Sequence, residues 1–165
     1  MARAVFNSSQ GSAQGLDEFL QKHRPSEAEP RQYAWIQINA PAAEYVEEGD
    51  SEGAEAAWLG TEEKSIARID AIAARFGVLG GKWLLFPRAA EADNCWNKIA
   101  RAVCEGKLGH SAKISTSPEG GCYCVCVYTV DYRDATDVWR VRRELRDLGT
   151  SDMRSFVLLR SLTSF

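Results

Sequence analysis

The spacing of apolar residues along the chain predicts both strands and helices. Residues 32–39 are aromatic and β-branched and predict a strand that Pro41 ends. Residues 82–86 form a short apolar run between two glycines and Pro87, which predicts a buried strand. Residues 111–116 and 122–130 flank a Ser-Pro-Glu-Gly-Gly turn and predict a β-hairpin. A last strand is expected at residues 156–159.

Apolar residues at helical spacing predict four helices, one before the first of these strands and three between them. Their expected positions are around Leu16 ending before Pro25, over residues 61–76 with Thr61 as N-cap, from Asp93 to Gly106, and from Asp134 to Gly149. Hairpins mixed with helices predict an α+β layer rather than a parallel α/β sheet. We expect one domain over residues 15–165, a flexible N-terminus over residues 1–14, and a solvated acidic loop over residues 44–55.

Composition narrows the class of protein. The chain has 165 residues, which fits one domain, and no apolar run near the length that spans a bilayer, so no membrane partner is expected. Five cysteines are an odd number, and three of them alternate along one strand; reduced thiols in the cytoplasm, with nuclear access possible, are the simpler interpretation. Net charge is −3, so the chain is no basic nucleic-acid binder by composition and no DNA partner is expected.

Candidate chemistry is sparse, and no catalytic motif is present. Cys122, Cys124, Cys126 and Tyr128 share one face of their strand, but alternate strand residues lie about 6.5 Å apart, so three thiols do not converge on one metal ion. A small-residue core or pocket face is favoured over a metal site, and no cofactor is expected. Trp58, expected in a loop, is the best tryptophan for stacking on a ligand, although a core role is favoured.

A basic cluster stands on the last predicted helix. Its members are Arg140, Arg142, Arg143 and Arg146. Arg142 and Arg146 are neighbours on a helix surface and could reach one phosphate-rich partner. A solvated helix face balanced by nearby carboxylates is the favoured interpretation.

The ordered motifs from Gly80 to Gly149 resemble one family. Gly80-Gly81-Lys82-Trp83, the helix from Trp96, the segment Gly106 to Ile114 and the helix from Asp137 to Gly149 are similar to the basophilic-leukaemia-expressed protein family, which has no assigned biochemical role. That family resembles translation initiation factor 4E in fold. The resemblance implies a curved antiparallel sheet with helices on the convex face, and a concave face that carries Cys122, Cys124, Cys126 and Tyr128.

The cap-binding residues of the translation factor are not matched. The segment before Gly80 holds no Trp-Glu pair, the hairpin turn holds residues 117–121 in place of basic ones, and Cys124 stands at one basic position. The resemblance therefore does not imply cap recognition.

Three functions remain open. The first is a non-catalytic binding or adaptor protein with a protein partner. The second is an RNA- or nucleotide-binding module, in which Tyr128 and Trp58 stack on a base while Lys82 or Lys113 meets phosphate. The third is a thiol-dependent enzyme that uses the cysteine-lined face. Ligand contacts on the concave face are expected from Trp58, Lys82, Lys113, Cys124, Cys126 and Tyr128. The acidic loop could also cover the concave face and repel anionic ligands.

Overall fold

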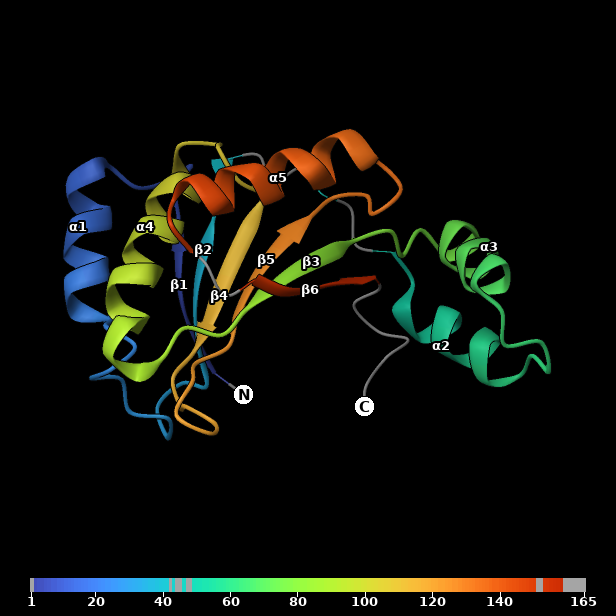
Figure 1. Cartoon of the computed structure of the whole chain (residues 1–165), viewed down its shortest axis with the longest axis horizontal. Helices are drawn as coiled ribbons and strands as arrows, with labels where there is room; N and C mark the ends of the chain where they lie inside the picture. Colours follow the sequence, from blue (N-terminus) through green and yellow to red (C-terminus); the bar gives the residue numbers. More distant parts are fainter. Residues whose placement is uncertain (1, 42, 44–45, 47–48, 151–152, 159–165) are drawn as a thin grey trace.

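The structure, a computed structural model, describes residues 2–41, 43, 46 and 49–150, and the backbone alone of residues 153–158. A six-stranded sheet forms its centre (Figure 1). The strands are β1 (Arg3–Asn7), β2 (Trp35–Asn39), β3 (Gly81–Leu85), β4 (Ser111–Ser115), β5 (Val125–Thr129) and β6 (Met153–Leu158), in the order β1-β2-β4-β5-β3-β6. All neighbours pair antiparallel except β1 and β2, which are parallel, so the sheet is mixed.

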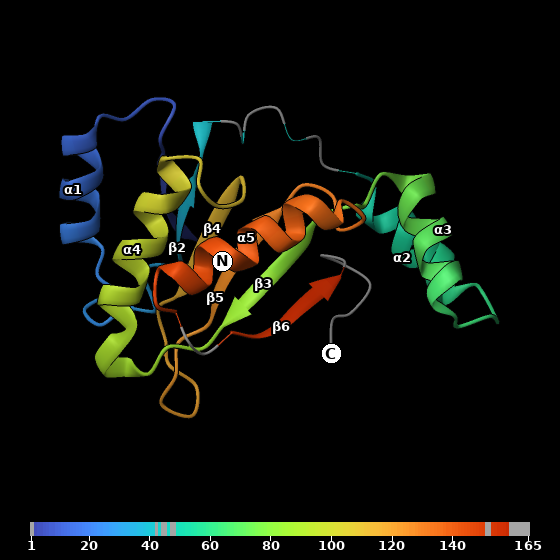
Figure 2. The ribbon, with the colours of Figure 1, turned by 45° about the horizontal axis from the view of Figure 1, so that its top comes forward.

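Three of the four predicted helices cover one face of this sheet (Figure 2). They are α1 (Ala13–Lys22), α4 (Ala92–Cys104) and α5 (Ala135–Asp147). Their apolar stripes meet alternate residues of the strands in one core, which includes Leu20, Trp96 and Val141 from the helices and Ile36 and Val127 from the sheet. The α+β class is therefore confirmed.

The N-terminus is not the flexible tail that the sequence predicted. Residues 3–7 form β1, because Ala4 and Phe6 alternate toward the core while Arg3, Val5 and Asn7 point the other way. The Phe6 ring lies 5.5 Å from that of Phe19 on α1. A strand of five residues with only two inward apolar side chains gives a weak alternation pattern. The Ser- and Gln-rich composition of residues 1–14 therefore led to the prediction of a flexible segment.

The predicted acidic loop is also partly wrong. Helix α2 runs over Ser51–Leu59, and Asp50 caps it by accepting a hydrogen bond of 2.8 Å from the backbone N–H of Gly53. The acidic residues of this helix are exposed, while Ala54 is buried against the next helix. Residues 44–45 and 47–48 of the predicted loop lie outside the described residues.

The next helix begins later than predicted. Helix α3 runs over Ile66–Phe76, and its N-cap is Ser65, whose hydroxyl accepts from the N–H of Arg68, rather than Thr61. Helix α4 follows a short 3-10 turn, η2 (Ala89–Glu91). Asp93 does not cap α4, because its carboxylate accepts hydrogen bonds of 3.0 and 2.6 Å from the backbone and hydroxyl of Ser26. Asp134 does cap α5.

Helices α2 and α3 form a hairpin with a small core of its own. Ala54, Ile72, Ala73 and Val78 are buried there, separately from the main core. The hairpin is joined to the sheet layer by the hydroxyl of Tyr132, which donates a 2.6 Å hydrogen bond to Asp70. Figure 1 shows the hairpin standing at the end of the sheet beyond β3.

Candidate functional site

The face of the sheet opposite helices α1, α4 and α5, here called the open face, gathers polar and aromatic side chains. Side chains alternate along each strand, so the residues between the core positions point to this face. They are Arg3, Val5, Asn7, Trp35, Gln37, Asn39, Lys82, Leu84, Ser111, Lys113, Ser115, Cys126 and Tyr128. None of the six strands contains an aspartate or a glutamate. The open face therefore carries the cations Arg3, Lys82 and Lys113 without a carboxylate from the same strands.

Lys113 stands at the centre of this face, between two aromatic rings. Its ammonium lies 4.1 Å from the centre of the Trp35 ring and 5.8 Å from that of Tyr128. Tyr128 is the direct cross-strand partner of both Lys82 and Ser111. The strand pairing thus sets two ammonium groups and two aromatic rings side by side, and the Lys113 ammonium gains from both ring faces.

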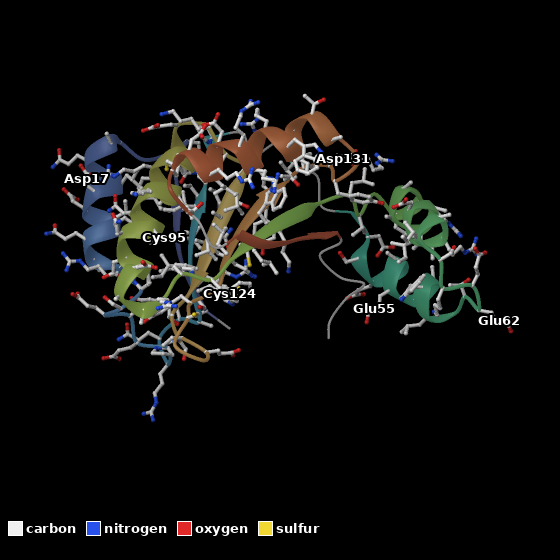
Figure 3. The ribbon with its side chains drawn as sticks, viewed as in Figure 1. Asp17, Glu55, Glu62, Cys95, Cys124 and Asp131 are labelled. Atoms are coloured by element: carbon white, nitrogen blue, oxygen red, sulfur yellow. The ribbon has the colours of Figure 1, made fainter. Side chains whose placement is uncertain are left out.

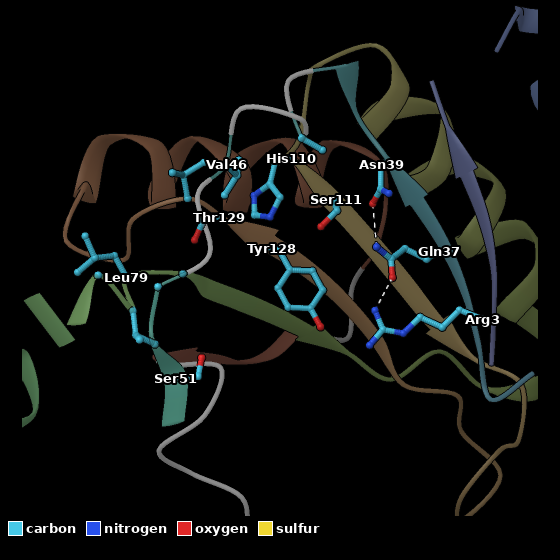
Figure 4. Close-up of a pocket in the computed structure, with 16 residues that line it drawn as sticks. Arg3, Gln37, Asn39, Val46, Ser51, Leu79, His110, Ser111, Tyr128 and Thr129 are labelled. Carbon is cyan, nitrogen blue, oxygen red and sulfur yellow. Dashed lines mark hydrogen bonds between the residues drawn. The ribbon is translucent and has the colours of Figure 1, made fainter. Parts of the chain in front are cut away.

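A chain of hydrogen bonds runs across β1 and β2 beside these rings (Figure 4). The guanidinium of Arg3 donates to Gln37 Oε1 at 3.0 Å, and the Gln37 amide donates to Asn39 Oδ1 at 2.8 Å. The Asn39 amide in turn donates to Asn7 Oδ1 at 2.7 Å. These contacts hold three amides and one guanidinium in fixed directions, because each group is oriented by its neighbour.

A pocket of about 510 Å³ opens at the end of this polar chain. Its wall includes Arg3, Gln37, Asn39, Ser111 and Tyr128 from the strands. Figure 4 shows these side chains directed toward one hollow, with His110 beside Tyr128 at 6.2 Å between ring centres. The volume is in the range of small-molecule sites. No aspartate or glutamate is among the described residues that line it.

The opposite rim of the pocket is formed by the segments that lead into and out of the α2–α3 hairpin. Val46, Gly49, Ser51 and residues 77–80 line it. Gly49 packs so closely on the Gly77 backbone that a Cβ there would lie 2.3 Å from the Gly77 carbonyl carbon. Only glycine permits this approach, so the rim is fixed by backbone packing rather than by side chains.

Two thiols lie on the open face next to the cations. The pKa of Cys126 is lowered, chiefly because its thiolate accepts a hydrogen bond from the Cys124 thiol and further because Lys113 and Lys82 are near; burial opposes this shift. The pKa of Cys124 is raised, since its proton is held in that hydrogen bond. Cys126 is only 3% exposed, which restricts access to its sulfur. All five cysteines are free.

The structure brings together most of the residues that the sequence singled out. Lys82, Lys113, Cys126 and Tyr128 share the open face, and Cys124 lies half-buried at its edge. Trp58 does not join them. It lies on α2 rather than in a loop, packs against the hairpin core with Lys64 4.2 Å from its ring centre, and is absent from the pocket wall.

The basic cluster on α5 divides into two parts. Arg140 is occupied within the fold, since its guanidinium donates to Asp137 at 2.7 Å and to the carbonyl of Lys107 at 2.6 Å. Arg142, Arg143 and Arg146 lie elsewhere on the helix surface, and α5 packs on the face of the sheet away from the pocket (Figure 2). The cluster is therefore not part of the open-face site.

Five residues of the open face and pocket were not predicted as site residues from the sequence: Arg3, Trp35, Gln37, Asn39 and His110. The alternation of residues 35–39, with Ile36 and Ile38 between polar and aromatic neighbours, was the signal for three of them. Arg3 gave no such signal, because its strand was not predicted. His110 reaches the pocket only through the pairing of β4 with β5, which sequence spacing does not reveal.

A family model described as "Basophilic leukemia-expressed protein Bles03" matches residues 59–155, more than half of the chain. The chain belongs to the Bles03 family. The matched range takes in β3, β4, β5, α4 and α5, and so includes the open-face residues Lys82, Lys113, Cys126 and Tyr128. Arg3 and β2 lie before it. The resemblance inferred from the sequence motifs is confirmed.

Solved structures of translation initiation factor 4E are similar to part of the Bles03 chain. A schistosome eIF4E complexed with m7GpppA and 4E-BP is 17% identical, with a TM-score of 0.41 over 48% of each chain. Ascaris suum eIF4E-3 with an m2,2,7G cap is 18% identical, with a TM-score of 0.42 over 53% of this chain and 54% of that one. C. elegans eIF4E-3 with the 4E-binding protein Mextli and a cap analogue is 16% identical, with a TM-score of 0.39 over 48% and 58%.

The Bles03 chain thus spans about half the length of the solved structures that it matches. What those proteins bind is a property of their own sites. No helix in the described part of this chain is long and apolar enough to cross a membrane.

Proposed function

We propose that this chain is a non-catalytic binding module that holds a nucleotide, free or within single-stranded RNA, on its open face. The observation that carries the proposal is the combination of Arg3, Lys82 and Lys113 with Trp35 and Tyr128 on a sheet without carboxylates. In a chain of net charge −3, this surface favours an anionic ligand with a flat ring.

The pocket supplies the other contacts that such a ligand needs. Tyr128 and His110 offer ring faces, and Gln37 and Asn39 offer oriented amide donors and acceptors. Arg3 lines the same pocket, so a phosphate beside a ring held there meets a guanidinium. A base within the pocket and phosphates toward Arg3 and Lys113 would use the ring faces, the oriented amides and two of the three cations of the open face.

A binding role suits this site better than thiol chemistry. A catalytic cysteine needs a stabilised thiolate that a substrate can reach. Cys126 has the lowered pKa but is almost fully buried, and the more accessible Cys124 has the raised pKa. The two requirements are thus divided between two residues. Because free thiols persist in a reducing compartment, we also propose that the protein is cytoplasmic.

The test is a fluorescence titration with mononucleotides, a cap analogue and short single-stranded RNA at low and moderate salt. We expect quenching of indole emission with affinity that falls as salt rises. Tyr128→Ala and Arg3→Gln weaken binding, whereas Lys107→Ala, an exposed lysine paired with Glu105, leaves it unchanged. Binding by mononucleotides as tight as by RNA identifies the free nucleotide as the ligand. RNA binding alone, with a steep salt dependence, identifies the strand.

If none of these ligands quenches the indole emission, the nucleotide proposal is refuted. The adaptor function would then be preferred, with a protein partner on the helical face. One observation supports that second candidate: Trp139 on α5 is 57% exposed, although indole rings are usually covered. A pull-down with Trp139→Ala as the matched negative variant distinguishes specific partners from background.

A further inference from the structure

The end of the α2–α3 hairpin presents apolar side chains to solvent. Leu59 and Ile66, on either side of the connection between the helices, are 72% and 76% exposed, more than any other large apolar residue of the described chain. The connection is held in place: Lys64 packs over the Trp58 ring and also donates to the Trp58 carbonyl. We call residues 58–66 the hairpin tip. Its two aliphatic side chains stand on an ordered turn.

Acidic side chains surround these aliphatic residues. Glu55, Glu62 and Glu63 are all exposed, and Lys64, the one cation of the tip, is engaged with Trp58. Figure 3 shows Glu55 and Glu62 at the end of the molecule farthest from α1. The tip therefore offers an apolar pair with a negative rim.

Helix α5 carries a surface of the opposite kind. Trp139, Arg142, Arg143 and Arg146 recur at i, i+3, i+4 and i+7, so they form one stripe, which we call the α5 stripe. Trp139 is 57% exposed, and the Arg142 guanidinium lies 4.9 Å from its ring centre. Within the described residues, none of these three arginines has a carboxylate within 4 Å.

We propose that the hairpin tip of one copy docks on the α5 stripe of a second copy of this chain. Leu59 and Ile66 would cover the Trp139 ring, and Glu62 and Glu63 would face Arg143 and Arg146. The two surfaces match in charge and in apolar content. The tip points away from α5 of its own chain in both Figure 1 and Figure 2, so the partner is another molecule.

The contact closes into a two-fold pair when each tip meets the stripe of the other copy. A single contact of this kind involves few side chains and is smaller than a standard protein interface, but the pair contains it twice. Association is therefore weak, reversible and sensitive to salt, because exposed charges form its rim. This inference is independent of the nucleotide proposal, since neither surface includes the pocket.

The test is sedimentation velocity of the full chain over a wide concentration range at low and high salt. We expect a monomer–dimer equilibrium that high salt weakens. The stripe reversal Arg143→Glu/Arg146→Glu and the tip reversal Glu62→Lys/Glu63→Lys each lower the association constant by at least about tenfold. A chain with all four substitutions regains association, because the charges have been exchanged.

Two further variants separate docking from misfolding. Leu59→Ser/Ile66→Ser removes the apolar part of the tip and should abolish association, whereas Arg31→Glu, at an exposed residue outside both surfaces, leaves it unchanged. Far-ultraviolet circular dichroism confirms the fold of each variant. A wild-type chain that stays monomeric throughout overturns the proposal. So does a dimer that survives both reversals, or a folded four-substitution chain that fails to associate.

Discussion

The ammonium of Lys113 on β4 lies 4.1 Å from the centre of the Trp35 ring on β2. The two residues are diagonal neighbours on adjacent strands, since Trp35 pairs with Ser115 and Lys113 with Gln37. The indole holds the lysine over the open face, between Arg3 on one side and Tyr128 on the other. A cation fixed in this way loses less conformational freedom when a phosphate binds it.

Replacing Lys113 with Met should therefore weaken binding of single-stranded RNA and lower its salt dependence. Removing one lysine–phosphate interaction reduces the slope of log affinity against log salt by about 0.7. Fluorescence titrations at several salt concentrations measure this slope, with Lys107→Met as the control. An unchanged slope would remove Lys113 from the proposed site.

The two tryptophans Trp96 and Trp139 should differ sharply in their effect on stability. Trp96 is 1% exposed at the centre of the main core, so Trp96→Ala should lower the free energy of unfolding by about 3–5 kcal/mol. Trp139 is mostly exposed, so Trp139→Ala should change it by no more than about 0.5 kcal/mol. Denaturant unfolding at dilute protein concentration measures both. Similar decreases for the two variants would contradict the assigned packing.

Native-state alkylation should be slow at both open-face thiols at neutral pH. The Cys126 thiolate is stabilised but buried, and the Cys124 thiol keeps its proton. Mass spectrometry after timed iodoacetamide treatment should show much faster labelling once the protein is unfolded. Cys95, whose pKa is raised to about 11 by burial, serves as an unreactive internal reference. Rapid labelling of Cys126 in the folded protein would support the alternative function, a thiol-dependent enzyme.

Tyr132 should make stability fall at alkaline pH. Burial and the hydrogen bond to Asp70 raise the pKa of Tyr132, so the folded protein keeps this proton after the unfolded chain, with a usual tyrosine pKa of 10.0, has released it. The unfolded state then binds fewer protons, and the free energy of unfolding decreases as pH rises above about 10.

The matched variant is Tyr132→Phe, which has no titrating hydroxyl at this position. At pH 8 the variant should have a lower melting temperature than the wild type, because the hydrogen bond to Asp70 is lost. Above pH 10 its melting temperature should decrease less than that of the wild type. Thermal unfolding between pH 8 and 11 measures both differences. Parallel curves for the two proteins would show that Tyr132 does not titrate differently on folding.

The sequence predicted the features that depend on the spacing of apolar residues and on local turn residues. Trp96, Ile99, Ala100 and Val103 marked the buried stripe of α4, and the Ser-Pro-Glu-Gly-Gly turn placed β4 beside β5. The alternation of residues 122–130 put Cys126 and Tyr128 on one face of their strand, and the structure places both on the open face while Tyr123, Val125 and Val127 lie in the core. These features depend on local spacing alone.

Other features depend on contacts between distant segments. Asp93 was predicted to cap a helix, but its carboxylate accepts a hydrogen bond from the hydroxyl of Ser26, which is far away in the sequence. The start of α3 was decided by Ser65 instead of Thr61, although both can cap a helix. Arg3 entered the site because β1 joins β2 in parallel, a pairing that requires the intervening α1 to cross back over the sheet. No single-segment pattern contains that information.

The division of the buried residues into two clusters has a consequence for dynamics. The main core joins five strands to α1, α4 and α5, whereas the hairpin has a separate core of four buried side chains, against which partly buried residues such as Trp58 and Phe76 pack. Amide protons of α2 and α3 should therefore exchange with solvent through a local opening that leaves β4 and β5 protected. A single melting temperature would then describe the sheet layer alone, while the hairpin opens and closes many times before the rest of the protein unfolds.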